Sequence, residues 1–320
     1  MRSDGKIYHD DWMNNGLPDK SVQLIIADPP YFEVKGDFDF IWKSFDDYLK
    51  DVEKWAIECK RLLADNGTLF WYGHAKNIAY AQVIFDKHFN LINNLVWDKG
   101  SFMGLEESEG LRSFAPCTER ILMYSNEEEN FVVDHLQKYL LSEFRKCGKP
   151  VSFYKELCGF TGNQPYNWFT PNNNGKAQWA FPKKEHYKKL KITGFFQKEY
   201  EELRKEYEEL RKEYEELRRP FINHFKLQEI LRFSNEATKT GSKYDHDTVK
   251  PETLTRALIL TCSRPNDLVV VPFAGSGTEC AMSVKEGRRT IGFEITEKHA
   301  KMSNERVQNI LRQQSLFVGS

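Results

Sequence analysis

Apolar runs that alternate with amphipathic helix patterns constrain the fold of this chain more than any other feature. Residues 21–27 and 68–72 are mostly apolar and rich in β-branched or aromatic side chains, which predicts buried strands. Residues 45–63 and 78–88 carry apolar side chains at helical spacing, and residues 91–97 and 120–124 are further strand candidates. This alternation predicts an α/β fold with a parallel sheet. At 320 residues, the chain suits one large domain or one domain with an insertion.

Composition excludes several classes of protein. No apolar run reaches the length of a membrane span, and the N-terminal residues lack the apolar core of a signal peptide. The six cysteines include no Cys-x-x-Cys pair, so neither a metal site nor a disulfide framework is predicted. A reducing cytoplasm is therefore the expected compartment. Because the net charge is only −1, a polyanionic partner would need a local basic patch.

Asp28-Pro29-Pro30-Tyr31 stands directly after the strand predicted at 21–27. The prolines fix φ at about −65° and push the preceding residue towards extended geometry, which leaves carbonyls able to accept hydrogen bonds from a ligand. A carboxylate, a carbonyl and an aromatic ring together suit an exocyclic amino group on a flat heterocycle. The alternative is an ordinary proline-rich turn. The position favours a site, because ligands of parallel α/β sheets bind at the carboxyl ends of the strands.

A second candidate site lies near the C-terminus. The apolar strand predicted at 268–271 runs into a turn with Gly275 and Gly277, and a helix begins near Thr278. The glycines let backbone approach a ligand closely, and the helix N-terminus offers free N–H donors. A second strand at 289–294 ends in Glu294, which can accept hydrogen bonds from ribose hydroxyls. Together these features predict a nucleoside cofactor.

Residues 132–191 have a different, basic character. A helix is predicted at 133–147, followed by two short helices at 152–158 and 163–169 joined by a turn with Gly159 and Gly162, which is typical of a helix-turn-helix. Residues 138–191 carry 11 Lys or Arg against three acids, with interleaved aromatics. This favours a reader of the DNA major groove. The alternative is a solvated helical insertion whose aromatics form its own core. The candidate DNA-binding residues are Lys155, Asn163, Gln164, Tyr166, Asn167, Trp168 and Lys176.

Three nearly identical heptads follow at 199–219, within a helix predicted at 197–219. Tyr and Leu alternate at the a and d positions, from Tyr200 and Leu203 to Leu217. Three heptads with tyrosine at the a positions are marginal for an independent coiled coil. We therefore expect one helix of roughly 30 Å that packs on its own protein, joins the basic module to the catalytic part and ends at Pro220. The predicted organisation is a first half at 1–131, an insertion at 132–235 and a second half at 236–320.

These motifs resemble the DNA amino-methyltransferases that use S-adenosyl-L-methionine, in the subgroup called beta. In that family the Asp-Pro-Pro-Tyr motif precedes the Phe-x-Gly-x-Gly motif, with the target-recognition region between them, which is the order of this chain. Further matches are Ile7 to Asp11, Thr118 to Leu122, and His246 to Pro251. The resemblance implies a Rossmann-like sheet of seven strands in permuted order with helices on both faces. It also implies a target base swung out of the DNA duplex.

The resemblance also implies roles for single residues. Asp28 and the Pro29 carbonyl would hold the amino group, with Pro30 shaping the turn and Tyr31 stacking on the base. Glu294 would hold the ribose and Asp11 would lie near the adenine of the cofactor. His246 and Lys250 would lie near its methionine end, although a capping histidine and a surface lysine are the plainer interpretations. The remaining cofactor residues implied are Asp28, Pro272, Phe273, Ala274, Gly275, Ser276, Gly277 and Thr278.

One position departs from the family pattern. Val271 stands where the family usually has Asp, just before the Pro-Phe of the glycine loop. Losing that acceptor would weaken cofactor binding by about 1–3 kcal/mol if an ammonium group were left unpaired. Asp28 or Glu279 could compensate, or the site could need DNA or a partner to complete it.

The leading functional hypothesis is a DNA adenine-N6 methyltransferase that acts on double-stranded DNA. The alternatives are cytosine-N4 methylation at the same site and a non-catalytic DNA-binding protein with a decayed site. The family further implies a homodimer, a cognate restriction endonuclease as partner, and a nucleoid-associated place in the cytoplasm of a bacterium or in a phage-infected cell.

Overall fold

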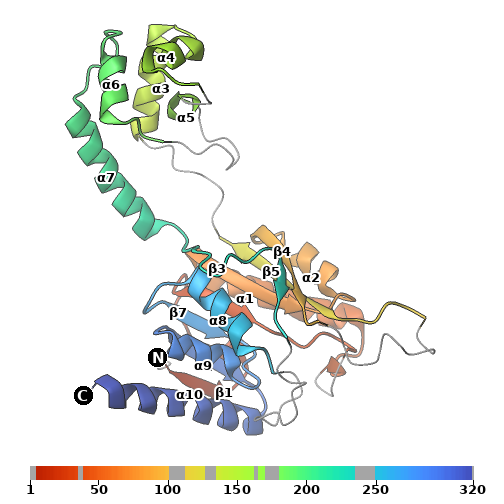
Figure 1. Ribbon diagram of the computed structural model, residues 1–320. Coiled ribbons are helices and arrows are strands. Elements are labelled where there is room, and N and C mark those ends of the chain that lie inside the picture. The colour runs from red at the N-terminus through yellow and green to blue at the C-terminus, as the bar shows by residue number, and fades with distance from the viewer. Residues whose placement is uncertain are drawn as a thin grey trace. The chain divides into compact units, whose positions relative to one another are not determined.

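The chain forms two compact units in a computed structural model that describes residues 5–34, 39–100, 112–126, 135–161, 165–169, 180–234 and 249–318 (Figure 1). The first unit comprises Met1–Glu127 and Arg219–Ser320, and the second comprises Glu128–Arg218. We predicted that the insertion would end at residue 235. The structure differs, because residues 219–234 return to the first unit and supply a strand to its sheet.

The described residues of the first unit build a sheet of eight strands in the order β1-β8-β7-β2-β3-β5-β4-β6. All neighbours are parallel except β5, which is antiparallel to both β3 and β4. The strands are β1 Lys6–His9, β2 Val22–Ala27, β3 Leu63–Gly73, β4 Asn90–Asp98, β5 Thr118–Ser125, β6 Ile230–Arg232, β7 Leu268–Val271 and β8 Arg289–Glu294.

Two expectations for the sheet need correction. The family pattern implied seven strands, but short β6 adds an eighth at the edge beside β4. The prediction of a parallel sheet does not extend to β5, which pairs antiparallel with β4 from Asn90↔Ser125 to Asp98↔Thr118. An antiparallel neighbour needs only a loop, whereas a parallel one needs a crossover, so the helix–strand alternation did not apply between these two strands.

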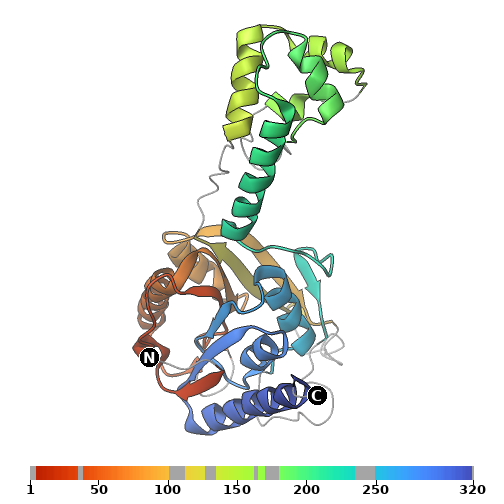
Figure 2. The ribbon, with the colours of Figure 1, turned by 90° about the vertical axis from the view of Figure 1, so that its left-hand side faces the viewer.

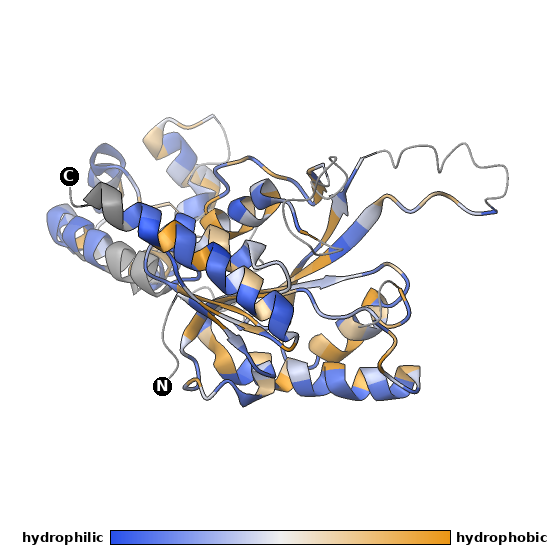
Figure 3. Cartoon of the chain, turned by 90° about the horizontal axis from the view of Figure 1, so that it is seen from below, coloured by the Kyte–Doolittle hydropathy of each residue, from blue (hydrophilic) through white to orange (hydrophobic). Residues whose placement is uncertain are grey.

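Helices cover both faces of the sheet. α1 Phe45–Leu62 and α2 Ile78–Phe85 pack on one face, and α8 Glu252–Cys262, α9 Thr278–Lys285 and α10 Glu297–Val318 supply the other. Figure 2 shows α10 beside the edge strand β1. Figure 3 shows hydrophobic strands between helices whose outer sides are largely hydrophilic. Within β7, Leu268 and Val270 face the first layer, and Val269 and Val271 face the second. Burial on both sides explains why the strands are continuously apolar.

The second unit is helical and has its own core. Its helices are α3 His135–Cys147, α4 Val151–Cys158, α5 Tyr166–Phe169, α6 Lys184–Lys191 and α7 Tyr200–Leu217. Large buried side chains such as Tyr154, Phe169 and Tyr187 fill this core. Among the described residues α5 is a single turn, and residues 162–164 and 170–179 on either side lie outside them, so the helix-turn-helix stays a prediction. The aromatics serve first as the core of the module, which was the alternative interpretation.

The heptad helix α7 packs on its own unit, as predicted. Leu203 is buried, and Tyr200 and Tyr207 lie against the core. The ring centroids of Tyr207 and Phe181 are 5.1 Å apart. The side chains of the later heptad positions lie outside the described residues. Within the described part of the chain, no helix combines the length and the apolar character that crossing a membrane requires.

Candidate active site

The two predicted site segments meet at one edge of the sheet. β2 and β7 are parallel neighbours, with Leu24 paired to Val269 and Ile25 to Val270. Asp28 therefore leaves β2 beside the glycine loop that leaves β7. This edge holds the carboxyl ends of the parallel strands, where α/β proteins bind their ligands.

Both carboxylate oxygens of Asp28 have partners within the chain. Oδ1 accepts a short hydrogen bond from the Tyr31 hydroxyl, and Oδ2 lies 2.8 Å from Lys250 Nζ. Burial first, and then the charges of Asp28 and Glu119, raise the pKa of the Tyr31 phenol well above its usual value. Tyr31 is thus a neutral donor to Asp28 in this structure. Its stacking on a base stays a prediction.

Lys250 links Asp28 to a second buried carboxylate. It is only 4% exposed, and its Nζ lies 3.2 Å from Glu119 Oε2, while Lys99 forms a short ion pair with the other oxygen of Glu119. Burial opposes the charged form of Glu119, but Lys250 and Lys99 outweigh it and lower its pKa to about 2. Burial would lower the pKa of Lys250, yet Asp28 and Glu119 raise it above its usual value. Glu119 and Lys250 are therefore both charged near neutral pH.

The position of Lys250 decides between the two interpretations of it. The interpretation of Lys250 as a surface lysine is wrong. Its ammonium group is buried among the rings of Tyr31, Tyr72 and Trp97, with Nζ 5.0–5.8 Å from their centroids. Its contacts are with Asp28 and Glu119, so contact with the methionine end of a cofactor stays a prediction. His246, the other residue of that segment, lies outside the described residues.

Two residues that the sequence did not single out hold the Asp28–Tyr31 turn. Asp39 accepts a hydrogen bond from the Tyr31 N–H at 2.7 Å. Asn77 donates to the carbonyls of Tyr31 and Phe32, the latter at 3.0 Å. Asn77 precedes α2 and looks like a helix cap in the sequence, but its side chain makes no capping bond. Glu119 was also missed, because an acid within a strand gives no local sign of its partner.

The glycine loop uses backbone conformations that other residues rarely adopt. Gly275 and Gly277 have φ of 48° and 73°, in the region that favours glycine. The buried residues of the loop are Pro272, Ala274, Ser276 and Thr278. Phe273 packs edge-on against Trp55, with the two ring centroids 5.1 Å apart. Arg306 braces the loop by donating to the Ser276 carbonyl at 3.1 Å and to the Thr278 hydroxyl at 3.0 Å.

Gly277→Ala is expected to destabilise the first unit more than Gly287→Ala does. Both glycines have φ above 70°, which costs an alanine about 1–2 kcal/mol. A Cβ at Gly277 would also lie 2.6 Å from Ser303 Cβ, whereas one at Gly287 would meet nothing within 4 Å. We expect an additional loss of about 1–3 kcal/mol for Gly277→Ala from overpacking. Urea unfolding measures both variants, and equal losses would contradict the steric argument.

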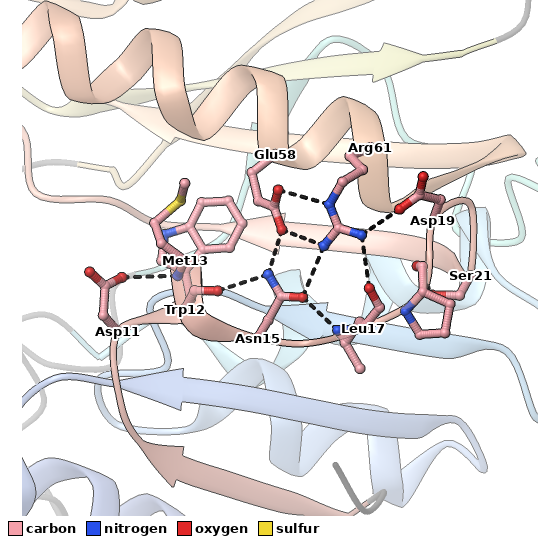
Figure 4. A network of polar contacts seen from close by, with 10 residues as sticks. Asp11, Trp12, Met13, Asn15, Leu17, Asp19, Ser21, Glu58 and Arg61 are labelled. Carbon is pink, nitrogen blue, oxygen red and sulfur yellow. Dashed lines mark hydrogen bonds and ion pairs between the residues drawn. The ribbon is translucent and has the colours of Figure 1, made fainter. Parts of the chain in front are cut away.

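Glu294 and Asp11 lie on neighbouring strand ends. Glu294 Oε2 accepts from the Gly275 N–H at 2.9 Å, and Oε1 accepts from the Thr296 N–H at 2.8 Å. A carboxylate has about four acceptor positions, so Glu294 can also serve a ribose. Asp11 follows β1, which pairs with β8 through His9↔Glu294. It caps the short helix η1 Trp12–Asn14 by accepting from the Met13 N–H at 2.9 Å, beside a network around Asn15, Glu58 and Arg61 (Figure 4).

The candidate DNA-binding residues have different surroundings. Trp168 is 3% exposed in the core of the second unit, so the expectation that it contacts DNA is wrong. Tyr166 is half-exposed, with Lys155 Nζ 5.7 Å from its ring centroid. The Asn167 carbonyl accepts from the Ala180 N–H at 3.2 Å. Asn163, Gln164 and Lys176 lie outside the described residues.

Comparison with known proteins identifies the family. A family model described as DNA methylase, of the N6/N4 type, matches residues 22–305. The chain belongs to the DNA methylase family. The match in this DNA methylase begins at β2 and extends into α10, so it includes both Asp28 and the glycine loop.

Three known proteins resemble this DNA methylase along most of its length. The DNA adenine methyltransferase YhdJ of Escherichia coli (strain K12) is 27% identical over 298 residues, covering 91% of this chain and 78% of that protein. The crystal structure of TTHA0409 from Thermus thermophilus, complexed with S-adenosyl-L-methionine, has a TM-score of 0.50 at 18% identity. The match covers 95% of this chain and 94% of that chain. PvuII DNA methyltransferase, which is cytosine-N4-specific, has a TM-score of 0.54 at 14% identity. The match covers 98% of this chain and 93% of that chain. The two solved structures support the fold.

Proposed function

We propose that this DNA methylase is an adenine-N6 methyltransferase that transfers a methyl group from S-adenosyl-L-methionine to an adenine flipped out of double-stranded DNA. The observation that carries the proposal is Asp28, a carboxylate at a strand end beside the glycine loop. The similarity to an adenine methyltransferase supports the choice of base.

The site fits the proposed cofactor. Gly275 and Gly277 present backbone without side chains, and the Glu294 carboxylate lies at the loop, where it can accept from ribose hydroxyls. The Glu279 Oε1 and Tyr72 hydroxyl oxygens are buried and have no hydrogen-bond partner. Leaving these two atoms unpaired is costly, so a polar ligand bound beside them would be favoured.

The residues of the turn would position the base. When bound, S-adenosyl-L-methionine supplies an electrophilic methyl group. Asp28 would accept one hydrogen of the exocyclic amino group and the Pro29 carbonyl the other, which directs the nitrogen lone pair at the methyl carbon. Transfer to the nitrogen would form an N–C bond as the S–C bond breaks, with S-adenosylhomocysteine as the leaving group and one amino proton passing to water. This arrangement works through orientation and a fixed negative charge.

Entry of the base requires an exchange of partners at Asp28. The Tyr31 hydroxyl and Lys250 hold its two oxygens in this structure. The incoming amino group would replace the Tyr31 hydroxyl, which frees that ring to stack on the base. Lys250 would keep its contact with the other carboxylate oxygen of Asp28.

DNA would also contact the second unit. Lys183, Lys184 and Lys188 are exposed on and just before α6, while Tyr187 and Leu190 anchor that helix in the core. Such a basic face supplies phosphate contacts, which position a protein on DNA without reading its sequence. The homodimer, the endonuclease partner and the nucleoid association stay predictions.

Nucleoside analysis tests the reaction. Double-stranded DNA of mixed sequence is incubated with the full chain and labelled cofactor, then digested to nucleosides. We expect label in N6-methyldeoxyadenosine. Label in N4-methyldeoxycytidine would instead establish the cytosine alternative. No incorporation with tight DNA binding would establish the non-catalytic alternative.

A further inference from the structure

Glu279 is a buried carboxylate that the transfer mechanism does not use. It lies in the first turn of α9, directly after the glycine loop, and is 4% exposed. Its Oε1 is buried without a hydrogen-bond partner. A buried carboxyl oxygen is normally paired, because leaving it unpaired forfeits its hydration without compensation. The position therefore calls for a partner that the chain itself does not supply to this oxygen.

The surroundings of Glu279 place that partner in the active site. Tyr72 is fully buried at the end of β3, and its hydroxyl is also unpaired. Tyr72 and Val271 belong to the same core cluster as Cys280 and Ala281 of α9, so they share the face of the sheet that α9 covers. Asp28 interacts electrostatically with both Tyr72 and Glu279. The two unpaired atoms thus belong to one charged neighbourhood.

The neighbouring cations contact other acids or loop atoms. Lys250 contacts Asp28 and Glu119, and Arg306 contacts Glu252 at 2.6 Å as well as the glycine loop. Asp28 adds negative charge rather than relieving it. The group that would satisfy Glu279 is therefore a cation with N–H donors, and an alkylammonium offers three of them.

We propose that Glu279 binds the ammonium group of the cofactor's methionine part, in place of the carboxylate that Val271 lacks. The proposal rests on the proposed function. Val271 faces the α9 layer, so an acid at that position and Glu279 would serve the same side of the loop. The unpaired Tyr72 hydroxyl would accept from the same ammonium group.

Proton release accompanies this binding. Burial, and then the charge of Asp28, raise the pKa of Glu279 to about 7, while Lys250 and Arg306 oppose the rise. Among the described residues, the charged and titratable groups that interact with Glu279 are Asp28, Lys250, Arg306, Tyr72 and the adjacent Cys280. A bound cation favours the ionised carboxyl, so Glu279 loses its proton on binding. Affinity should therefore rise with pH up to about 7 and then level off.

Calorimetry of the full chain tests the proposal with three probes. S-adenosyl-L-methionine and S-adenosylhomocysteine both carry the ammonium group, whereas 5′-methylthioadenosine lacks it. In Glu279→Gln we expect the first two to bind about 10- to 100-fold more weakly and the third to bind unchanged. Exposed Glu305→Gln on α10 is the matched control and should alter none of them. Titrations in buffers of different ionisation heat should show release of about half a proton at pH 7 by the wild type.

The outcomes separate this proposal from the proposed function. If the wild type does not bind S-adenosyl-L-methionine, the proposed function fails. If it binds and Glu279→Gln binds equally well, the role of Glu279 is overturned while the function stands. Weakening for S-adenosyl-L-methionine alone would assign Glu279 to the sulfonium and also overturn it. Should the variant not fold, equal proton release by the wild type with S-adenosylhomocysteine and 5′-methylthioadenosine would overturn the proposal.

Discussion

Asp28→Asn is expected to reduce the rate of methyl transfer by about 10²- to 10³-fold, the usual loss when one preorganised electrostatic group is removed from an active site. Asparagine keeps the shape of the side chain but loses the charge that would stabilise the amino group as positive charge develops on nitrogen. The change should appear in kcat, whereas the dissociation constant for DNA should stay within about twofold, because phosphate contacts dominate DNA affinity. Single-turnover transfer and DNA titration measure the two quantities.

A matched surface aspartate controls for Asp28→Asn. Asp65 forms an ion pair with Lys20 at 2.8 Å, with both side chains more than 60% exposed. Asp65→Asn should leave transfer unchanged. Because Asp28→Asn also breaks the ion pair with Lys250, DNA binding at the assay temperature is used to show that the variant is folded. Retention of more than a tenth of the wild-type rate by the folded variant would contradict the catalytic assignment.

Lys250→Met is expected to lower the free energy of unfolding by about 3–5 kcal/mol at pH 7, because it leaves buried carboxylates without their cation. The ammonium lies within 3.2 Å of both Asp28 and Glu119, and methionine supplies similar volume without charge. Lys99 would still pair with Glu119, so Asp28 bears most of the loss. Urea unfolding measures the difference, with Lys20→Met at the exposed ion pair as the control, where we expect less than about 1 kcal/mol.

The effect of Lys250→Met should depend on pH in a defined direction. The pKa of Glu119 is about 2 in the folded protein and about 4.5 in its ordinary state. The ion pair therefore contributes stability above pH 4.5, and this contribution is lost as the pH falls towards 2. The difference in the free energy of unfolding between wild type and Lys250→Met should shrink over the same pH range. A loss no larger than that of Lys20→Met, or a gap independent of pH, would show that Lys250 does not stabilise the cluster.

Local patterns in the sequence predicted the parts of the site. The apolar run before Asp28, the glycines of the loop and the acid that ends β8 each report on their own few residues. Such patterns encode backbone conformation and burial, which depend on neighbours in sequence. The strand-end position of Asp28, the positive φ of Gly275 and Gly277, and the packing of Tyr200, Leu203 and Tyr207 were all predictable for this reason.

Patterns were less reliable where one residue type suits two environments. The aromatics between 154 and 187 suit either a DNA surface or a core, and the structure buries Trp168 and Tyr187. Burial of an aromatic ring is settled by the surrounding helices, which a local window does not contain.

The sequence by itself therefore determined most of the strands, the two loops and the family to which they belong, because those depend on short-range periodicity and on backbone freedom at single positions. Only the tertiary structure decided which charges meet. Lys250 contacts Asp28 and Glu119 from far along the chain, and Glu279 is left with an unpaired oxygen beside them. The physical reason is that sheet order brings distant strand ends together. The cost of burying charge then selects their partners, and neither effect is visible in a local stretch of residues.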